Sequence, residues 1–326
     1  MHKQESLRKK IAIITGITGQ DGPYLAHFLL GQGYEVVGLV RSYIYSGKDR
    51  LAHLGVKDKV QLELCDLQDY SQIIQTIERY QPDEVYNLAA QSSVSMSFSQ
   101  PLSTIHFNVM SVLHLLEAIR LFKPDARFYQ ASSSEMYGKV EQLPITEKTV
   151  FHPLSPYAIS KASAHWTAIN YREVHGLFTC CGVLFNHESY LRSEDFFVKK
   201  VIRQSIEISR GERDFLEVGN IDIRRDFGSA KKYVEAMWLM LQQEQPDDFI
   251  ICSGHSITLR SIVEHVFQRL GISPERLLIS PKLFRPTEIQ DNYGDNSKAR
   301  KLLGWEYNLS FYDVLDEMLE EELQNV

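Results

Sequence analysis

The first half of the sequence alternates between short apolar runs and longer stretches with apolar residues at helical spacing. The run at residues 11–14 is followed by a glycine-rich turn, which is typical of a strand buried on both faces. Strands and helices in alternation imply parallel strands joined by right-handed crossovers. The pattern therefore predicts an α/β protein built on a doubly wound parallel sheet. The predicted strands are residues 11–14, 35–40, 60–64, 84–88, 127–131 and 177–184, and the predicted helices are residues 24–30, 102–122 and 157–175.

The regular alternation ends near residue 186. Residues 186–194 are polar and predict a loop, whereas residues 249–252 form a short apolar run that predicts a strand returning to the sheet. A chain of 326 residues is long enough for one large domain or two closely joined ones. We therefore expect a nucleotide-binding domain at residues 1–185, to which about residues 229–253 return, and a smaller, mostly substrate-binding lobe at residues 186–326.

A glycine-rich turn, residues 15–22 (TGITGQDG), joins the first predicted strand to the first predicted helix. Glycines in such a turn let backbone amides approach a phosphate closely, and the helix N-terminus adds partial positive charge. The spacing alone also fits an ordinary tight turn, but its place between a buried strand and a helix favours a dinucleotide site in a Rossmann-type sheet. The candidate cofactor residues of this turn are Gly16, Thr18, Gly19, Gln20, Asp21 and Gly22.

The end of the second predicted strand bears on the choice of cofactor. A chain that binds NAD usually has Asp or Glu about 20 residues after the glycine turn, to hold the ribose 2′-hydroxyl. This chain has Arg41 there, with Lys48 and Arg50 soon after. A cation suits the 2′-phosphate of NADP, so we expect NADP rather than NAD, with a solvated arginine as the alternative. Asp66 and Leu67, just past the third strand, predict either an adenine contact or an ordinary strand-end turn.

Charge and cysteine content argue against several other classes of protein. Lysine and arginine number 35 against 42 acidic residues, and the net charge of −7 offers no cation excess for a general nucleic-acid binder. The four cysteines are scattered and form no Cys-x-x-Cys pair, so neither a disulfide framework nor a zinc site is indicated. No uninterrupted apolar run reaches the roughly 18 residues of a membrane span. We expect a cytoplasmic protein without a metal, nucleic acid or membrane.

Tyr157 and Lys161 lie four residues apart in a predicted helix, so both project from one face. A nearby ammonium favours the phenolate, because an opposite charge lowers the pKa of a tyrosine. Such a tyrosine takes a proton from a substrate hydroxyl while the cofactor accepts hydride from the same carbon. The pair alone is commonly a surface feature. After a strand that ends in Ala-Ser-Ser-Ser (residues 131–134), and beside the glycine turn, it predicts a dehydrogenase-type site.

Glu135 follows these serines at the carboxyl end of a predicted parallel strand, the edge at which open α/β sheets bind ligands. A simple dehydrogenase needs no carboxylate there. An enzyme that removes water needs a group that abstracts a proton next to the new carbonyl and then protonates the leaving hydroxyl. Glu135 suits both steps, and a loop glutamate that caps the following turn is an equal alternative on these grounds.

Eight segments together resemble the extended short-chain dehydrogenase/reductase superfamily and, within it, the GDP-mannose 4,6-dehydratase family. The resemblance covers nearly the whole chain. The glycine turn and the Tyr-Lys pair mark only the superfamily, whereas LFNHES, RDFG and FRPTE indicate the GDP-mannose branch. The segments are residues 15–22, 86–92 (YNLAAQS), 128–138 (FYQASSSEMYG), 155–161, 184–189 (LFNHES), 219–228 (GNIDIRRDFG), 233–243 and 284–288 (FRPTE).

The resemblance implies a hydro-lyase that converts GDP-D-mannose to GDP-4-dehydro-6-deoxy-D-mannose with a tightly bound NADP recycled at each turnover. Tyr157 would deprotonate the 4-hydroxyl, Lys161 would tune Tyr157 and hold the nicotinamide ribose, and Ser133 (threonine in the family) would hydrogen-bond the oxyanion. Glu135 would remove the C5 proton. The resemblance also implies cofactor contacts from Leu88, Ala89 and Ala90, and substrate contacts from Ser92, Asn186, Glu188, Arg192, Lys199, Arg225, Arg285 and Glu288.

Several alternatives remain open at the level of sequence. A reductase or epimerase of the same superfamily needs no glutamate after the serines, so Glu135 favours the dehydratase, and another GDP-sugar remains a possible substrate. A non-enzymatic NADP-binding sensor would normally lack the Tyr-Lys pair. Each binding cation has a surface ion pair as its alternative. The family's paired arginines appear here as Arg41-Ser42, and a tetramer-forming arm before the third strand is shorter, so we expect a homodimer or a homotetramer.

Overall fold

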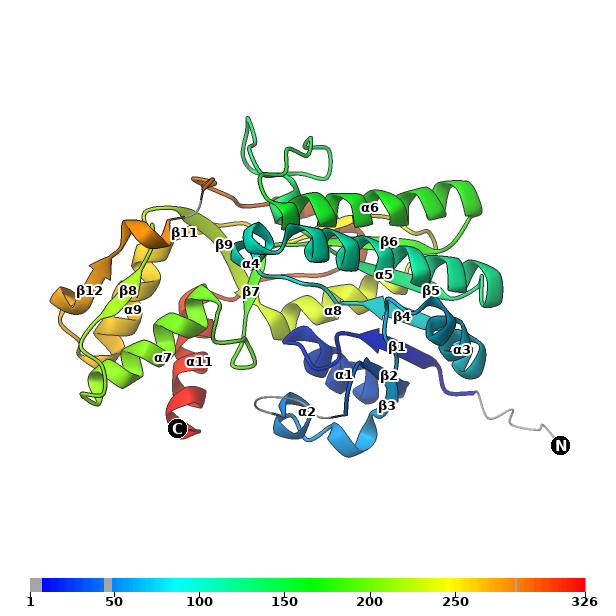
Figure 1. Ribbon diagram of the computed structural model, residues 1–326, viewed down its shortest axis with the longest axis horizontal. Helices are drawn as coiled ribbons and strands as arrows, with labels where there is room; N and C mark the ends of the chain where they lie inside the picture. Colours follow the sequence, from blue (N-terminus) through cyan, green and yellow to red (C-terminus); the bar gives the residue numbers. More distant parts are fainter. Residues whose placement is uncertain (1–7, 44–48, 285, 326) are drawn as a thin grey trace.

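The computed structural model describes residues 8–43, 49–284 and 286–325. A large sheet carries helices on both faces, and a smaller body of short strands and helices lies beside it (Figure 1). The strands are β1 (Ile11–Thr15), β2 (Glu35–Val40), β3 (Gln61–Leu64), β4 (Glu84–Asn87), β5 (Arg127–Ser133), β6 (Thr179–Leu184), β7 (Asn186–Glu188), β8 (Leu216–Val218), β9 (Arg224–Ser229), β10 (Phe249–Ile251), β11 (Ser256–Thr258) and β12 (Leu277–Ile279). The α-helices are α1 (Asp21–Gly31), α2 (Arg50–His53), α3 (Tyr70–Tyr80), α4 (Val94–Ser99), α5 (Pro101–Phe122), α6 (Pro156–His175), α7 (Phe197–Ser209), α8 (Ala230–Leu241), α9 (Leu259–Leu270), α10 (Ser297–Leu303) and α11 (Phe311–Gln324).

Seven strands form one parallel sheet in the order β10-β6-β5-β4-β1-β2-β3, which confirms the predicted doubly wound fold class. β1 lies inside the sheet and pairs with β2 on one side and β4 on the other. The strand order reverses at this point, so the loops that leave β1 and β4 diverge. The crevice at their carboxyl ends is where open α/β sheets bind ligands.

Alternate side chains of β1 enter different layers of the core, as the two-residue period of a strand requires. Ile13 packs with α3, α5 and α6 on one face, and Ile14 packs with α1 and α8 on the other. Figure 1 shows the two layers on either side of the sheet. Both side chains are fully buried, which explains why the β1 run contains no polar residue before Thr15. The buried pair Cys180 and Cys181 of β6 divides between the same two layers.

α5 alone among the described helices has the length and composition of a membrane span. It packs along α6 and α3, and its buried side chains, which include Val112, Leu115 and Leu116, belong to the core layer on that face of the sheet. A core helix passes the same test of length and composition.

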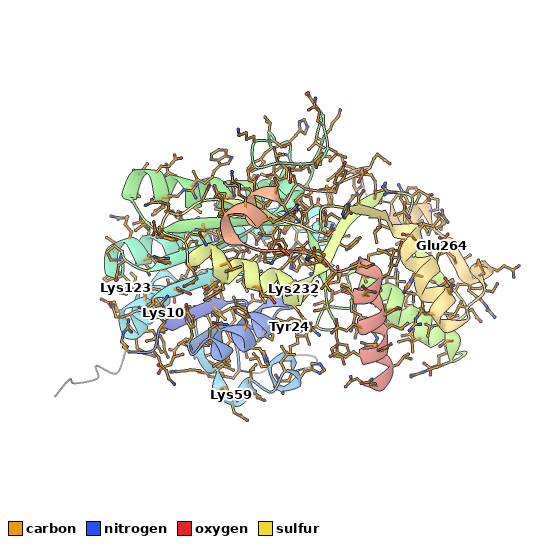
Figure 2. All side chains as sticks on the ribbon, turned by 180° about the vertical axis from the view of Figure 1, so that it is seen from behind. Lys10, Tyr24, Lys59, Lys123, Lys232 and Glu264 are labelled. Atoms are coloured by element: carbon orange, nitrogen blue, oxygen red, sulfur yellow. The ribbon has the colours of Figure 1, made fainter. Side chains whose placement is uncertain are left out.

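Figure 2 shows Lys123, just beyond the end of α5, and Lys10, just before β1, at the end of the molecule opposite to Glu264 of α9.

The smaller body contains two short sheets, β11-β9-β7 and β12-β8, with α7, α9 and α11 packed against them. The predicted return of a strand after residue 248 is confirmed, because β10 pairs with β6 at the edge of the main sheet. The prediction of a loop over 186–194 was wrong at its start: residues 186–188 form β7, which pairs with β9. The division into domains at residue 185 stays a prediction.

Candidate active site

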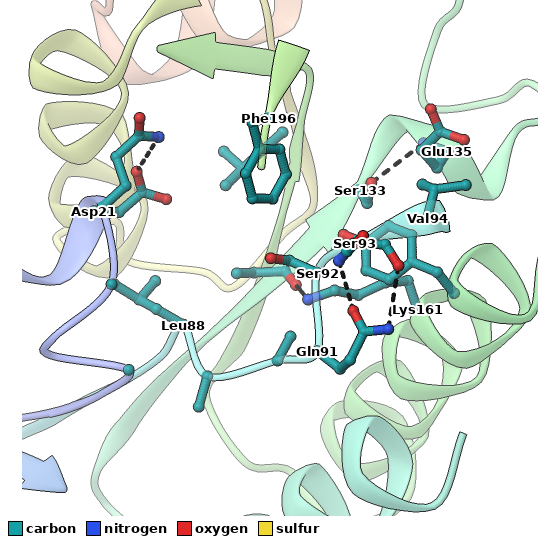
Figure 3. A pocket seen from close by; sticks show the side chains of 18 of the residues that line it. Asp21, Leu88, Gln91, Ser92, Ser93, Val94, Ser133, Glu135, Lys161 and Phe196 are labelled. Atoms are coloured by element: carbon teal, nitrogen blue, oxygen red, sulfur yellow. Dashed lines mark hydrogen bonds between the residues drawn. The ribbon is translucent and has the colours of Figure 1, made fainter. Parts of the chain in front are cut away.

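A cavity of about 770 Å³ opens at the carboxyl ends of β1, β4, β5 and β6, beside β7 and β9. Figure 3 shows Asp21 and Leu88 toward one end of it and Ser133 with Glu135 toward the other. All four predicted catalytic residues and nearly all predicted cofactor residues line this one cavity. The predicted site residues on its wall are Gly16, Thr18, Gly19, Gln20, Asp21, Gly22, Arg41, Leu67, Leu88, Ala89, Ala90, Ser92, Ser133, Glu135, Tyr157, Lys161, Asn186, Glu188, Arg192 and Arg225.

The glycine turn (residues 15–22) is packed so closely that side chains are excluded at two positions. Gly16 has φ +68°, and a Cβ there would lie 2.9 Å from the amide nitrogen of Ala89. A Cβ on Gly22 would lie 2.6 Å from the Gly16 carbonyl oxygen. The Thr15 hydroxyl accepts hydrogen bonds from the amides of Leu88 (3.1 Å) and Ala89 (3.0 Å), which ties this turn to the end of β4. The turn thus fits the backbone cradle that a dinucleotide phosphate requires.

Of the residues predicted to contact adenine and ribose, Arg41 and Leu67 line the cavity and Asp66 does not. Arg41 lies on the cavity wall with its guanidinium 6.0 Å from the centre of the Phe107 ring, and Leu67 also lines the cavity. Asp66 does not line it. Its carboxylate accepts a hydrogen bond from the Gln68 amide at 3.0 Å, as in the strand-end turn that was the alternative. Lys48 lies outside the described residues.

Two adjoining elements position the predicted catalytic side chains. Ser133 ends β5, and its hydroxyl accepts a hydrogen bond from the Glu135 amide at 3.3 Å (Figure 3). Tyr157 and Lys161 lie in the first turns of α6, which begins where the Ser155 hydroxyl caps the amide of Ala158 at 3.1 Å. The Lys161 ammonium donates to the carbonyl oxygen of Ala131 at 2.8 Å, so α6 is held against the end of β5.

The pKa values of Tyr157 and Lys161 depart from the prediction that the ammonium would favour the phenolate. Burial raises the pKa of Tyr157 to about 12, although a hydrogen bond with Ser133 lowers it, and the Glu135 carboxylate raises it further. Burial lowers the pKa of Lys161 to about 8. The physical reason is that desolvation penalises both charged forms, while the ammonium bonds to a carbonyl oxygen of β5. The hydrogen bond with Ser133 is the interaction that favours loss of the Tyr157 proton.

His187, which sequence reasoning missed, forms a buried ion pair with Asp21 of the glycine turn. Its Nδ1 lies 2.7 Å from the carbonyl oxygen of Phe185, and its Nε2 lies 2.9 Å from an Asp21 carboxylate oxygen. Both partners can only accept, so both ring nitrogens carry protons and the ring is cationic. Burial lowers the pKa of His187, but the Asp21 carboxylate more than offsets this and leaves it raised; the pKa of Asp21 is lowered despite burial. The LFNHES segment was the available signal.

We expect this ion pair to stabilise the protein only within a limited pH window. The raised pKa of His187 means that its contribution is complete below 6.5, its ordinary value, and is lost as the pH rises through the folded-state pKa. The lowered pKa of Asp21 means that its contribution is present above 3.8 and is lost as the pH falls. Chemical unfolding of wild type and His187→Asn between about pH 5 and pH 9 should therefore show a stability gap that narrows as the pH rises.

His265→Asn is the matched control, because the His265 ring also pairs with an aspartate, at 2.8 Å, but in a more exposed place between α9 and α11. This variant controls for the general cost of removing a histidine–aspartate contact. A His187 gap that widened toward alkaline pH would contradict a cationic ring.

The predicted substrate residues fall into two groups. Asn186, Glu188, Arg192, Arg225 and Ser92 line the cavity. Within this group the Arg192 guanidinium lies 3.3 Å from the Glu188 carboxylate and stacks over the Phe196 ring at 3.6 Å, so its charge stays at the cavity wall.

Lys199 and Glu288 do not line the cavity, and Arg285 lies outside the described residues. The buried Lys199 ammonium contacts the Glu322 carboxylate of α11 at 2.5 Å and the Tyr190 carbonyl oxygen at 2.6 Å. The structure therefore places Lys199 in an ion pair between helices, behind the segment that carries Arg192. The alternative to a substrate contact was a surface ion pair. Lys199 does form an ion pair, but a buried one.

A parallel sheet with a glycine turn after β1, and a Tyr-Lys pair facing the end of β5, defines an extended short-chain dehydrogenase/reductase. A family model described as GDP-mannose 4,6 dehydratase matches residues 13–318. GDP-mannose 4,6 dehydratase 2 of Arabidopsis thaliana is 44% identical, over 97% of this chain and 87% of the relative. The chain belongs to the GDP-mannose 4,6-dehydratase family.

Solved structures of lower identity share the fold. DesIV, a dTDP-glucose 4,6-dehydratase from Streptomyces venezuelae with NAD and TYD bound, gives a TM-score of 0.87 at 21% identity and covers 97% of both chains. RMD from Pseudomonas aeruginosa complexed with NADPH gives 0.81 at 24% identity, covering 98% of this chain and all of that one. At these identities the likeness shows the fold alone.

Proposed function

We propose that this protein converts GDP-D-mannose to GDP-4-dehydro-6-deoxy-D-mannose with loss of water. The observation that carries the proposal is that Glu135 lines the same cavity wall as Ser133 and Tyr157. A carboxylate beside the hydroxyl-deprotonating pair is what an elimination adjacent to a new ketone requires, and a reductase has no use for it. Membership of the family supports the same reaction and the same sugar nucleotide.

The residues divide the proton transfers between them. When bound, a nicotinamide dinucleotide accepts hydride from C4 of the hexose and returns it to C6. In its deprotonated form, which the hydrogen bond with Ser133 favours, Tyr157 accepts the proton of the 4-hydroxyl. The ketone at C4 acidifies the C5 proton, which Glu135 removes and then delivers to the departing 6-hydroxyl. When hydride adds at C6, C5 takes up a proton, and this matches the proton that Tyr157 gained, so both side chains return to their starting state. Lys161, held by the Ala131 carbonyl oxygen, keeps a cation at the foot of the cavity below about pH 8.

We propose NADP as the cofactor. Arg41 on the cavity wall supports it, since a guanidinium suits a 2′-phosphate and no carboxylate takes the place usual in NAD-binding chains. The similarly folded proteins differ in this respect, RMD being complexed with NADPH and DesIV with NAD. Dissociation constants of both dinucleotides, measured on the cofactor-stripped protein by calorimetry, test the choice. We expect NADP to bind at least about tenfold more tightly.

Mass spectrometry of the products formed from a panel of GDP-hexoses tests the reaction and the sugar. With GDP-mannose and no added reductant, we expect a product lighter by one water. Consumption of NADPH with a 4-keto sugar nucleotide, and no product from GDP-mannose, would instead establish the reductase.

We further propose that two or more copies assemble in the cytoplasm through the outer face of α5 and α6. Leu102 (85% exposed), Ile105, Ile159 and Trp166 (59% exposed) place large apolar side chains in solvent on these two adjoining helices. A patch of this kind suits a self-complementary interface. Light scattering coupled to gel filtration, on wild type and Trp166→Glu, measures the assembly.

A further inference from the structure

Arg50, the first residue of α2, joins two segments that are far apart in the sequence. Its Nη1 donates to the carbonyl oxygen of Thr18 at 2.9 Å, within the glycine turn. Its Nε donates to the carbonyl oxygen of Leu191 at 2.8 Å, and its Nη2 lies 3.1 Å from the hydroxyl oxygen of Ser193. Leu191 and Ser193 flank Arg192, and residues 189–193 are called the Arg192 segment below. A planar guanidinium with five fixed donors suits such a three-way bridge.

α2 itself is held in place, so the bridge has a firm base. The Asp49 carboxylate caps the helix by accepting from the Ala52 amide at 3.1 Å. His53, in the last turn, stacks on Tyr190 of the Arg192 segment at 4.6 Å and contacts the Glu321 carboxylate of α11 at 2.6 Å. Figure 1 shows α2 on the side of the large sheet that faces α11.

Other side chains join the glycine turn to β7 and the Arg192 segment along the cavity wall. The Gln20 amide donates to the His187 carbonyl oxygen at 3.0 Å and accepts from the Ser189 hydroxyl at 3.1 Å. The His187–Asp21 ion pair lies beside them. Gln20, Asp21 and His187 line the cavity, whereas Ser189 and Arg50 do not. Arg50 therefore acts on the two segments from behind, without touching a ligand.

We propose that Arg50 is a positioning residue that clips the glycine turn to the Arg192 segment, so that the cofactor side and the substrate side of the cavity keep one geometry throughout a turnover. The proposal rests on the proposed function for its consequence, but not for its structural basis. The glycine turn and the Arg192 segment keep a fixed relative position only if an interaction joins them. Three charge-assisted hydrogen bonds from the Arg50 side chain join them.

The consequence concerns the interval between two hydride transfers. In the first transfer, C4 loses hydride to the nicotinamide and the 4-hydroxyl proton passes to Tyr157, which leaves GDP-4-dehydro-D-mannose in the cavity. Dehydration and return of the hydride to C6 must follow before this ketone dissociates. Without the Arg50 hydrogen bonds the two segments move apart more easily and the ketone dissociates, which leaves reduced nicotinamide on the protein. Arg50 thus suppresses abortive turnovers.

Hydrogen–deuterium exchange of the cofactor-loaded protein tests the clip without substrate. In Arg50→Gln we expect amides of the glycine turn and of the Arg192 segment to exchange about tenfold faster together. Arg127→Gln is the matched control, because Arg127 also donates to backbone carbonyl oxygens, those of Leu241 and Gln243, but at the amino end of β5. Unchanged exchange in both segments of Arg50→Gln, or an equal rise in Arg127→Gln, overturns the proposal.

Abortive turnover is the second readout. With excess GDP-mannose, Arg50→Gln should accumulate reduced nicotinamide about tenfold faster per product formed than wild type or Arg127→Gln. Arg50→Lys keeps the charge but not the planar guanidinium, so its accumulation of reduced nicotinamide per product should lie between those of Arg50→Gln and wild type. This variant also serves as the test if Arg50→Gln fails to fold. If Arg50→Gln forms product more slowly but accumulates no more reduced nicotinamide per product than wild type, the proposed role of Arg50 is wrong. If wild type forms no dehydrated product, the proposed function fails instead, and the exchange measurement still decides the role of Arg50.

Discussion

Glu135→Gln is expected to lower product formation by about 10²- to 10⁴-fold while the first hydride transfer persists. A glutamine of the same shape cannot remove the C5 proton or protonate the 6-hydroxyl. The backbone around it should be unaffected, since the bond that fixes residue 135 runs from its amide to the Ser133 hydroxyl at 3.3 Å. Reduced nicotinamide should therefore accumulate on mixing with GDP-mannose, and its absorbance is the measurement.

A second measurement follows the proton itself. Wild type in heavy water should exchange deuterium into C5 of the hexose, and Glu135→Gln should not. Glu141→Gln is the control, because Glu141 lies exposed a few residues further along the same segment and does not line the cavity. Near-normal product formation by Glu135→Gln would remove the carboxylate from the mechanism and with it the main argument for dehydration.

Tyr157→Phe is expected to lower the overall rate by about 10²- to 10⁴-fold, with no reduced nicotinamide formed on mixing with substrate. Phenylalanine lacks the phenolate oxygen that accepts the proton in the proposed mechanism as hydride leaves C4, so this variant should stop one step earlier than Glu135→Gln. Binding of the dinucleotide should change little, because Asp21 of the glycine turn and Leu88 lie away from Lys161 in the cavity (Figure 3).

Tyr129→Phe is the matched control for this variant. Tyr129 is fully buried in β5, outside the cavity, and its hydroxyl has no hydrogen-bond partner among the residues that the structure describes. Loss of that hydroxyl should leave both activity and stability near the wild-type values. Turnover by Tyr157→Phe within a few fold of wild type would assign the proton transfer to another group, for which Ser133 is the nearest candidate.

The large sheet was predictable because its strands are buried on both faces. Residues 35–40 are apolar after the first position, since every later side chain enters one of two core layers, and the observed strand has the predicted bounds. β7 and β9 escaped prediction for the opposite reason. β9 contains Arg224, Arg225 and Asp226, and a charged run is a poor sign of a strand.

Burial of Arg225 and Asp226 depends on partners distant in the sequence. The Asp226 carboxylate accepts from the amides of Ser253 (2.8 Å) and Gly254 (3.0 Å), and the Arg225 guanidinium donates to the carbonyl oxygen of Ile289 at 2.6 Å. Desolvation nevertheless raises the pKa of Asp226 to about 6. A window of neighbouring residues holds no trace of such compensation, so the sequence pattern predicted no strand at β9.

Local sequence predicted many of the residues that line the cavity. The glycines of the turn, a Tyr-Lys pair one helical turn apart and a glutamate at a strand end are each recognised by short-range geometry, which a few adjacent residues specify. Only the tertiary structure decided which partners the charged side chains meet: His187 meets Asp21, Arg50 meets Thr18 and the Arg192 segment, and Lys199 meets Glu322 rather than a ligand. The physical reason is that water solvates a charged side chain in the unfolded chain, so the local sequence does not specify its partner. A partner becomes necessary only when folding buries the charge.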